Sequence, residues 1–211
     1  MSSDNPQYAL AIHTSSPELG LALSNFQGEV RSQSWNLGRD LSVKLHQHLA
    51  EFIQPQTWSD LKFITVAKGP GSFTGTRMGV VTARILAQQL DIPLFSISTL
   101  AGMAWQIFQT DLTLSENLAL QMPAQRSQFF VAIYSKQKHL IECLPDSVMS
   151  LEMWQKTLET WQKPYKLVKL EGGFGDSAIS LLELANVDFQ QGKSPHWSEA
   201  LPFYGQHPVD N

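Results

Sequence analysis

The residues with the most distinctive chemistry lie in one glycine-rich loop. It runs from Lys68 to Arg77 with the sequence Lys-Gly-Pro-Gly-Ser-Phe-Thr-Gly-Thr-Arg and joins an apolar run to a helical pattern. Glycine permits positive φ and the close approach of a second backbone or a ligand, and Pro70 fixes one φ. Thr74 or Thr76 can cap the following helix, whose free N–H groups attract anions. The loop is therefore a shaped turn where a phosphate could sit.

Two phosphate-binding motifs can be tested against this loop by their spacing. A Walker loop needs lysine directly after its last glycine, but Gly75 is followed by Thr76 and Arg77. A dinucleotide fingerprint needs G-x-G-x-x-G, and the spacing from Gly71 to Gly75 is one residue too wide. Both motifs are excluded. The residues alone favour a tight strand-to-helix connection without a ligand.

The same stretch resembles a family signature. Gly69-Pro-Gly-Ser-Phe-Thr-Gly-Thr-Arg-Met-Gly79 is similar to G-P-G-S-F-T-G-x-R-x-G of the TsaB (YeaZ) family, accessory proteins of bacterial tRNA threonylcarbamoyladenosine biosynthesis. The resemblance is strong from about Ala9 to Leu100 and weak beyond. It implies an α/β chain with the actin-like ATPase (ASKHA) fold, built from ribonuclease-H-like lobes with the second lobe reduced. It also implies no self-sufficient active site and no catalytic or metal-binding residue.

The resemblance implies partners as well. These are the catalytic subunit TsaD, in a heterodimer, and the ATPase TsaE, in a larger complex through which alone tRNA would be contacted. No cofactor belongs to the chain itself, although ATP or ADP could bind at the interface with TsaD. The residues expected to shape the loop and the partner interface are Gly69, Pro70, Gly71, Ser72, Phe73, Thr74, Gly75, Arg77, Gly79 and Ala83. Within the motif, Ser72, Thr74 and Thr76 are assigned to helix capping or anion contact, and Phe73 and Arg77 to the interface.

The helix expected over Thr76–Leu90 is apolar on two sides. At about 100° per residue, its broad apolar arc includes a strip of small residues, namely Gly79, Ala83 and Ala87. Its narrower arc contains Met78, Val81 and Ile85. One side must pack on the helix's own sheet, and the small-residue strip would admit another helix, from this chain or from a partner. Burial of both sides within the monomer remains an alternative. The same surface would let two copies form a homodimer when TsaD is absent.

The elements around the loop follow the order of a ribonuclease-H-like unit. The sequence predicts strands over Tyr8–Thr14, Leu19–Ser24, Glu29–Trp35, Phe63–Ala67 and Pro93–Ser98. Helices are predicted over Asp40–Gln54 and Thr76–Leu90, and a third, capped by Ser98 or Thr99, ends near Gln109.

A shorter cycle of elements follows in the second half of the chain. Its strands are predicted over Asn117–Met122, Gln128–Tyr134, His139–Cys143 and Tyr165–Leu170. One helix carries Trp154 and Leu158, and another, capped by Asp176, reaches Ala185. The predicted domains are an N-terminal lobe over residues 1–110 and a smaller C-terminal lobe with an irregular tail over 111–211.

The end of the first strand argues against autonomous catalysis. Nucleases and kinases of this fold type hold divalent cations with carboxylates at strand ends. Here His13 stands where relatives of this fold, including typical TsaB members, carry Asp. A neutral imidazole is a poor ligand for magnesium, so a structural histidine is favoured over a general base. The stretch Pro123–Phe130 also departs from the family pattern D-A-R-R-G-E-V-Y, so no role is carried over to its missing acidic residues.

Composition narrows the classes of function. A net charge of −4 without a basic run argues against direct nucleic-acid binding. The single cysteine, Cys143, excludes an internal disulfide and is read as a core residue. No apolar run has bilayer-spanning length and no leader is recognisable, so a cytoplasmic protein with no membrane contact is expected.

Three functional hypotheses remain at this point. The preferred one is a non-catalytic scaffold that binds and activates TsaD for threonylcarbamoyl transfer to the adenosine next to the tRNA anticodon. The alternative is an autonomous actin-like phosphotransferase or glycopeptidase-like enzyme. A third is a diverged paralogue that keeps the fold without the partner, which the changes at His13 and Gln125 motivate.

Overall fold

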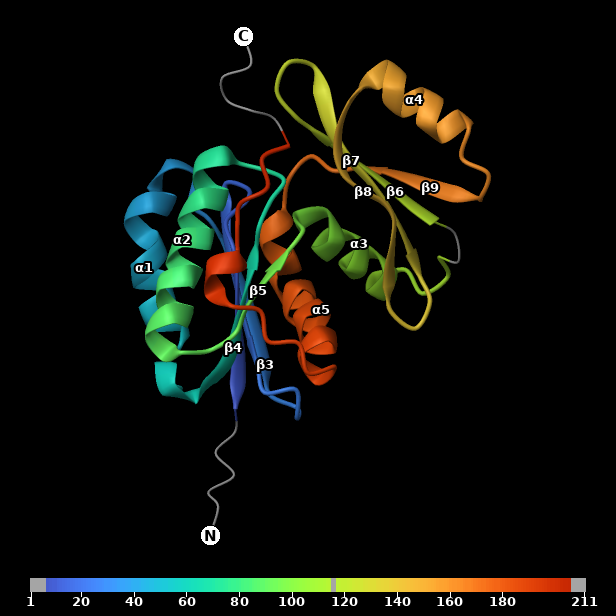
Figure 1. The fold of residues 1–211 in the computed structure, drawn as a ribbon. Helices are drawn as coiled ribbons and strands as arrows, with labels where there is room; N and C mark the ends of the chain where they lie inside the picture. Colours follow the sequence, from blue (N-terminus) through green and yellow to red (C-terminus); the bar gives the residue numbers. More distant parts are fainter. Residues whose placement is uncertain (1–6, 115–116, 206–211) are drawn as a thin grey trace.

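The chain forms two sheets, each flanked by helices (Figure 1). The computed structural model describes residues 7–114 and 117–205. The first sheet has the order β3-β2-β1-β4-β5, in which β1 to β3 are antiparallel and β4 and β5 run parallel to β1. Its strands are β1 Tyr8–His13, β2 Glu18–Ser24, β3 Val30–Asn36, β4 Leu61–Ala67 and β5 Leu94–Ile97. The predicted α/β fold and ribonuclease-H-like order are confirmed.

The second sheet has four strands in the order β8-β7-β6-β9. They are β6 Asn117–Pro123, β7 Gln128–Lys136, β8 Leu140–Ser150 and β9 Tyr165–Lys169. Strand β9 runs parallel to β6, and the other neighbours are antiparallel. The helices of the chain are α1 Leu41–Phe52, α2 Phe73–Leu90, α3 Thr99–Thr110, α4 Leu151–Glu159 and α5 Ala178–Gln190.

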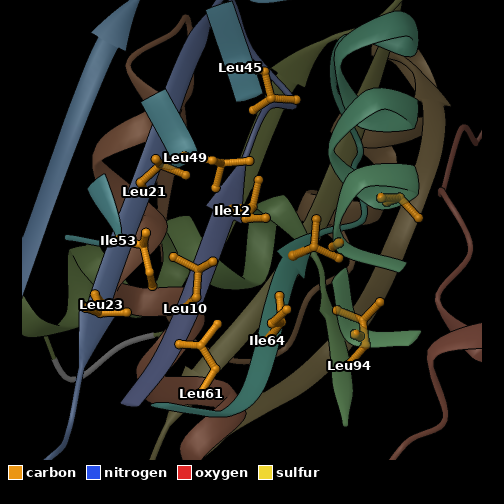
Figure 2. Packing of buried hydrophobic residues seen from close by; sticks show 14 of the residues in the cluster. Leu10, Ile12, Leu21, Leu23, Leu45, Leu49, Ile53, Leu61, Ile64 and Leu94 are labelled. Carbon is orange, nitrogen blue, oxygen red and sulfur yellow. The ribbon is translucent and has the colours of Figure 1, made fainter. Parts of the chain in front are cut away.

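Alternation of side chains along the central strand β1 sorts the helices onto the two faces of the first sheet. Leu10 and Ile12 point toward α1 and α2, where Figure 2 shows them with Leu45 and Leu49. Ala9 and the other alanines of the opposite face pack against α5. Successive strand residues face opposite sides, so the large residues build a thick core under two helices while the small ones admit one close helix.

The helices do not follow the predicted division at residue 110. Helix α3 packs Leu100 and Phe108 into the core of the second sheet, although it lies before that boundary. Helix α5 packs Leu181 and Ala185 onto the first sheet, although it lies after it. The boundary separates the two sheets, but each apolar helix face covers the sheet that offers a matching apolar surface. Trp154 of α4 is buried on the remaining face of the second sheet.

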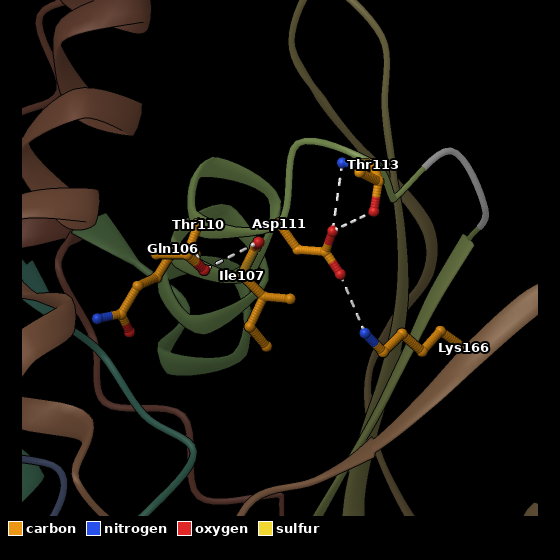
Figure 3. Close-up of polar contacts among 6 residues, drawn as sticks. All are labelled: Gln106, Ile107, Thr110, Asp111, Thr113 and Lys166. Atoms are coloured by element: carbon orange, nitrogen blue, oxygen red, sulfur yellow. Dashed lines mark hydrogen bonds and ion pairs between the residues drawn. The ribbon is translucent and has the colours of Figure 1, made fainter.

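Polar contacts hold the end of α3 against the second sheet (Figure 3). The Asp111 carboxylate accepts hydrogen bonds from the hydroxyl and the N–H of Thr113, at 2.6 and 3.2 Å. Lys166 of β9 lies 3.1 Å from the other carboxylate oxygen. The Thr113 hydroxyl and then the Lys166 ammonium lower the pKa of Asp111. Because the pair is on the surface, its role is to fix the direction of the chain rather than to add much stability.

Several predicted boundaries need correction. Helix α2 begins at Phe73, three residues before the predicted start, and β8 extends to Ser150. Asp176 lies in a short 3-10 turn before α5 rather than at its cap. Ser98 does cap α3, as predicted, by accepting a hydrogen bond from Ala101 N–H. Cys143 is half-buried and packs against the core beneath α4.

Candidate functional site

The glycine-rich loop holds the first turn of α2 against the end of β1. The N–H of Ser72 donates to the carbonyl of Ser15 at 2.7 Å. The Thr14 hydroxyl donates to the carbonyl of Gly75 at 2.7 Å, and the hydroxyls of Thr76 and Ser15 lie 3.1 Å apart. One backbone hydrogen bond and two hydrogen bonds from side-chain hydroxyls therefore fix the start of the helix against the residues that follow β1.

Three glycines of the signature are required by this close approach. A Cβ at Gly71 would lie 2.0 Å from the Ser15 carbonyl oxygen, and one at Gly75 would lie 2.1 Å from the Thr14 carbonyl oxygen. A Cβ at Gly79 would lie 2.1 Å from the Thr14 hydroxyl oxygen. The glycine spacing, which fits no phosphate-binding motif, is thus explained by backbone contact between a helix and a strand.

Of Ser72, Thr74 and Thr76, the residues expected to cap the helix or contact an anion, Ser72 is the one that caps α2. Ser72 occupies the cap position and accepts a hydrogen bond from the N–H of Gly75 at 3.2 Å. Thr76 is buried inside the first turn, where its hydroxyl meets Ser15, and Thr74 is exposed. Both threonines fail as caps because the helix starts at Phe73, which places them within it.

The C-terminal segment lies on the glycine loop. Phe203 N–H donates to the Lys68 carbonyl at 2.6 Å, and a Cβ at Gly69, whose φ is +96°, would meet the Phe203 carbonyl oxygen at 2.5 Å. The Tyr204 ring lies on Phe73 with centroids 4.6 Å apart. Sequence reasoning missed this contact, because its one sequence signal, Pro202 followed by Tyr204 two residues later, is too short to place the segment.

Arg77 completes an exposed cluster with these two rings. Its guanidinium carbon lies 4.9 Å from the Phe73 centroid and 5.9 Å from that of Tyr204. Cation–π contacts at the surface contribute on the order of 0.5–1 kcal/mol, so the cluster orders the side chains without locking them. Phe73 and Arg77, both expected at a partner interface, are therefore available on the surface.

One side of α2 is buried and the other is exposed to solvent. The strip of small residues that was expected to contact a partner lies on the buried side. Gly79 and Ala83 face the chain's own first sheet and are buried. Val81 and Ile85 of the narrower arc are 52% and 54% exposed. The expectation that Gly79 and Ala83 contact a partner is therefore wrong. Small residues are needed because β1 and its end lie close beneath them.

A shallow groove accompanies the exposed side of α2. Its volume is about 350 Å³, and it lies between α1 and α2. It is lined by Ser42, Leu45, His46, Arg77, Met78, Val81, Thr82 and Ile85. Val43 of α1, which follows Ser42 of the groove in the chain, is 79% exposed, so both helices carry apolar side chains in contact with solvent.

A larger cavity of about 590 Å³ lies on the other side of the glycine loop. Its walls are the turn 15–17 after β1, the start of α2, the turn between β6 and β7, the loop 170–174 and Tyr204. Both sheets therefore contribute to it. Of the predicted site residues, Gly71, Ser72 and Phe73 line this cavity, while Arg77 lines the groove on the helices.

His13 at the end of β1 is fully buried. Neither ring nitrogen has a hydrogen-bond partner in the described part of the chain. Burial lowers the pKa of His13 to about 4, and the nearby Glu18 opposes this shift. The imidazole is therefore neutral at pH 7, and His13 is not among the residues that line the cavity. This environment fits a structural histidine.

No residue cluster suited to a metal ion was found within residues 7–114 and 117–205. The same residues include no helix long and apolar enough to cross a bilayer.

The backbone contact under α2 predicts a strong effect of Gly75→Ala. The added methyl group would meet the Thr14 carbonyl, so the free energy of unfolding should fall by about 1–3 kcal/mol, as overpacked sites typically do. Urea denaturation measures this. Gly172→Ala is the matched control, because a Cβ there has open space around it. Equal stability of the two variants would contradict the steric explanation.

The depressed pKa of His13 predicts that stability falls as the pH drops from about 6.5 toward about 4. In this pH window His13 is protonated in the unfolded chain but not in the folded chain. The free energy of unfolding therefore rises with pH by up to about 1.4 kcal/mol per pH unit. In His13→Leu, the difference in unfolding free energy between pH 7 and pH 5 should shrink. Leu in place of the exposed His139 should leave that difference at the wild-type value, and identical behaviour of the two variants would contradict the assignment.

Comparison with known proteins agrees with the signature in the loop. The family model "TsaD: tRNA N6-adenosine threonylcarbamoyltransferase" matches residues 39–187. The TsaB protein of tRNA threonylcarbamoyladenosine biosynthesis from Bacillus subtilis is 34% identical over 74% of this chain and 67% of its own length. The protein of the same name from Haemophilus influenzae is 33% identical over 69% and 70%.

Solved structures show the same fold. A Pseudomonas aeruginosa protein described as similar to peptidase YEAZ superposes with a TM-score of 0.78 over 95% of this chain and 100% of its own, at 20% identity. YeaZ from the same organism gives a TM-score of 0.76 over 94% and 99%, also at 20% identity. Together with the sequence matches, these comparisons show that the chain belongs to the TsaB (YeaZ) family.

Proposed function

We propose that this chain is a non-catalytic subunit in tRNA threonylcarbamoyladenosine biosynthesis. It binds a TsaD subunit and holds it in the active state for threonylcarbamoyl transfer to the adenosine next to the tRNA anticodon. The family relatives named for this pathway support the biological context. In a larger complex TsaE joins the pair, and tRNA contacts the assembly rather than this chain alone.

The observation that carries the proposal is the exposed apolar face of α1 and α2. Val81 and Ile85 project from α2 beside the groove, and Val43 projects from α1. Contiguous apolar surface on a protein marks an interaction site more often than isolated exposed residues do. Arg77 and Phe73 border this face and extend it toward the C-terminal segment. The face is suited to helices of a partner that carry an apolar stripe.

The alternative is an autonomous enzyme, and the match to the TsaD family model is what favours it. The end of β1 opposes it, because a buried neutral His13 stands at the strand end where a carboxylate would hold a divalent cation. In the proposal the chemistry belongs to TsaD. ATP or ADP at the interface between the subunits remains a prediction of the family resemblance.

Association with TsaD from the same organism tests the proposal. Wild type should co-elute with TsaD in size-exclusion chromatography, and Ile85→Glu should weaken the complex at least tenfold, because a carboxylate would be buried in an apolar contact. Leu112→Glu is the matched control, since Leu112 is also exposed but lies just after α3, the helix that packs on the second sheet.

Failure of the wild type to associate under any nucleotide condition would contradict the proposal. So would equal affinity of Ile85→Glu and wild type, since the partner would then use another surface. The same face also predicts a homodimer when TsaD is absent, because a twofold contact uses one patch twice. Light scattering across protein concentration would show dimers for wild type and monomers for Ile85→Glu, whereas dimers of both would place the contact elsewhere.

A further inference from the structure

The exposed side of α2 carries an apolar stripe with a regular spacing. Met78, Val81 and Ile85 all line the groove, and successive members of the stripe are three and four residues apart. This alternation is the spacing by which helices pack side by side in coiled coils and helix bundles. The stripe therefore fits a partner helix that lies along α2.

Arg77 and Arg84 form one edge of this stripe. They are seven residues apart in α2, so they lie on the same side of the helix and about 10 Å from each other along its axis. Each arginine directly precedes a residue of the stripe. In paired helices, the charges on residues that flank the apolar stripe decide which helices pair with one another.

Aromatic rings of the C-terminal segment position both arginines. This segment lies beside α2 (Figure 1). The guanidinium carbon of Arg77 lies 5.9 Å from the ring centroid of Tyr204. That of Arg84 lies 5.7 Å from the ring of Trp197. A ring orients a guanidinium without neutralising its charge. Within residues 7–114 and 117–205 neither arginine forms an ion pair, so both charges are available to a partner.

The charge of this face is opposite in sign to that of the whole chain. Helix α2 contains the two arginines and no acidic residue, whereas the chain has a net charge of −4. Helix α1 adds one lysine and one glutamate, whose charges cancel. A second copy of this chain would bring positive charge against positive charge, and like charges across an interface act against a partner. A helix with carboxylates beside its own apolar stripe would instead pair with both guanidinium groups.

We propose, on the basis of the proposed function, that Arg77 and Arg84 select an acidic helix of TsaD over a second copy of this chain. In the complex each guanidinium pairs with a carboxylate of that helix, and Val81 and Ile85 pack in the apolar contact beside them. In a dimer of two copies the same arginines meet a positive surface and weaken the contact. The apolar stripe thus supplies contact area, and the arginines supply the choice of partner.

The salt dependence of association tests this choice, because salt screens both the attraction to carboxylates and the repulsion between copies. Biolayer interferometry with TsaD from the same organism should show wild type binding about five- to tenfold more tightly at about 50 mM than at about 500 mM sodium chloride. Light scattering of the chain alone should show the opposite trend, with more dimer at the higher salt concentration.

Variants of the two arginines separate charge from shape. The double variant Arg77→Gln/Arg84→Gln should bind TsaD about five- to tenfold more weakly at low salt, mainly through slower association, and should form homodimers more readily than wild type. Arg77→Lys/Arg84→Lys keeps both charges and should retain the wild-type response to salt. Lys138→Gln is the matched control. Lys138 is exposed in the turn between β7 and β8, so both associations should stay at their wild-type values.

Three results would overturn the proposal. They are salt-independent binding of wild type to TsaD, equal association rates with TsaD for the arginine-to-glutamine variant and Lys138→Gln, and homodimers of the arginine-to-glutamine variant no more stable than those of wild type. Each of these leaves the proposed function standing as long as Ile85→Glu weakens the complex with TsaD. Absence of any complex between wild type and TsaD would instead reject both proposals.

Discussion

The backbone contact between the first turn of α2 and the end of β1 is the constraint on which the rest of the structure depends. Hydrogen bonds from Ser72 and Thr14 join the two segments at 2.7 Å each. A side chain at Gly71 or Gly75 would push them apart. This contact sets the angle of α2, which in turn decides which residues reach the sheet and which face outward.

The same contact accounts for the glycines that give the loop the appearance of a phosphate-binding loop. In the loop, Gly75 packs against the Thr14 carbonyl, and the Ser72 hydroxyl caps α2. The surfaces available to other molecules lie on either side of this contact. Apolar side chains such as Ile85 face solvent on one side, and a cavity lined by residues from both sheets lies on the other.

The individual helices and strands could be predicted because the periodicity of apolar residues and the turn residues are patterns among neighbours in the sequence. Ser98 was one of two residues predicted to cap α3, and the strands through Ile97 were predicted close to their observed bounds. The side on which a helix packs was not predictable in the same way. The strip at Ala83 is small enough for either a partner helix or a close sheet, and the position of Thr14 beneath Gly79 decides for the sheet. The contact of Tyr204 with Phe73 joins residues too far apart for any local pattern to reveal.

The crossed packing of α3 and α5 has a consequence for synthesis on the ribosome. The first sheet is covered on one face once α2 is complete, but its other face receives Leu181 and Ala185 only from α5, near the end of the chain. Alanines such as Ala9 must therefore stay exposed while the second sheet is being made. The N-terminal half therefore leaves the ribosome with one face of its sheet uncovered, and the last helix of the chain completes that face.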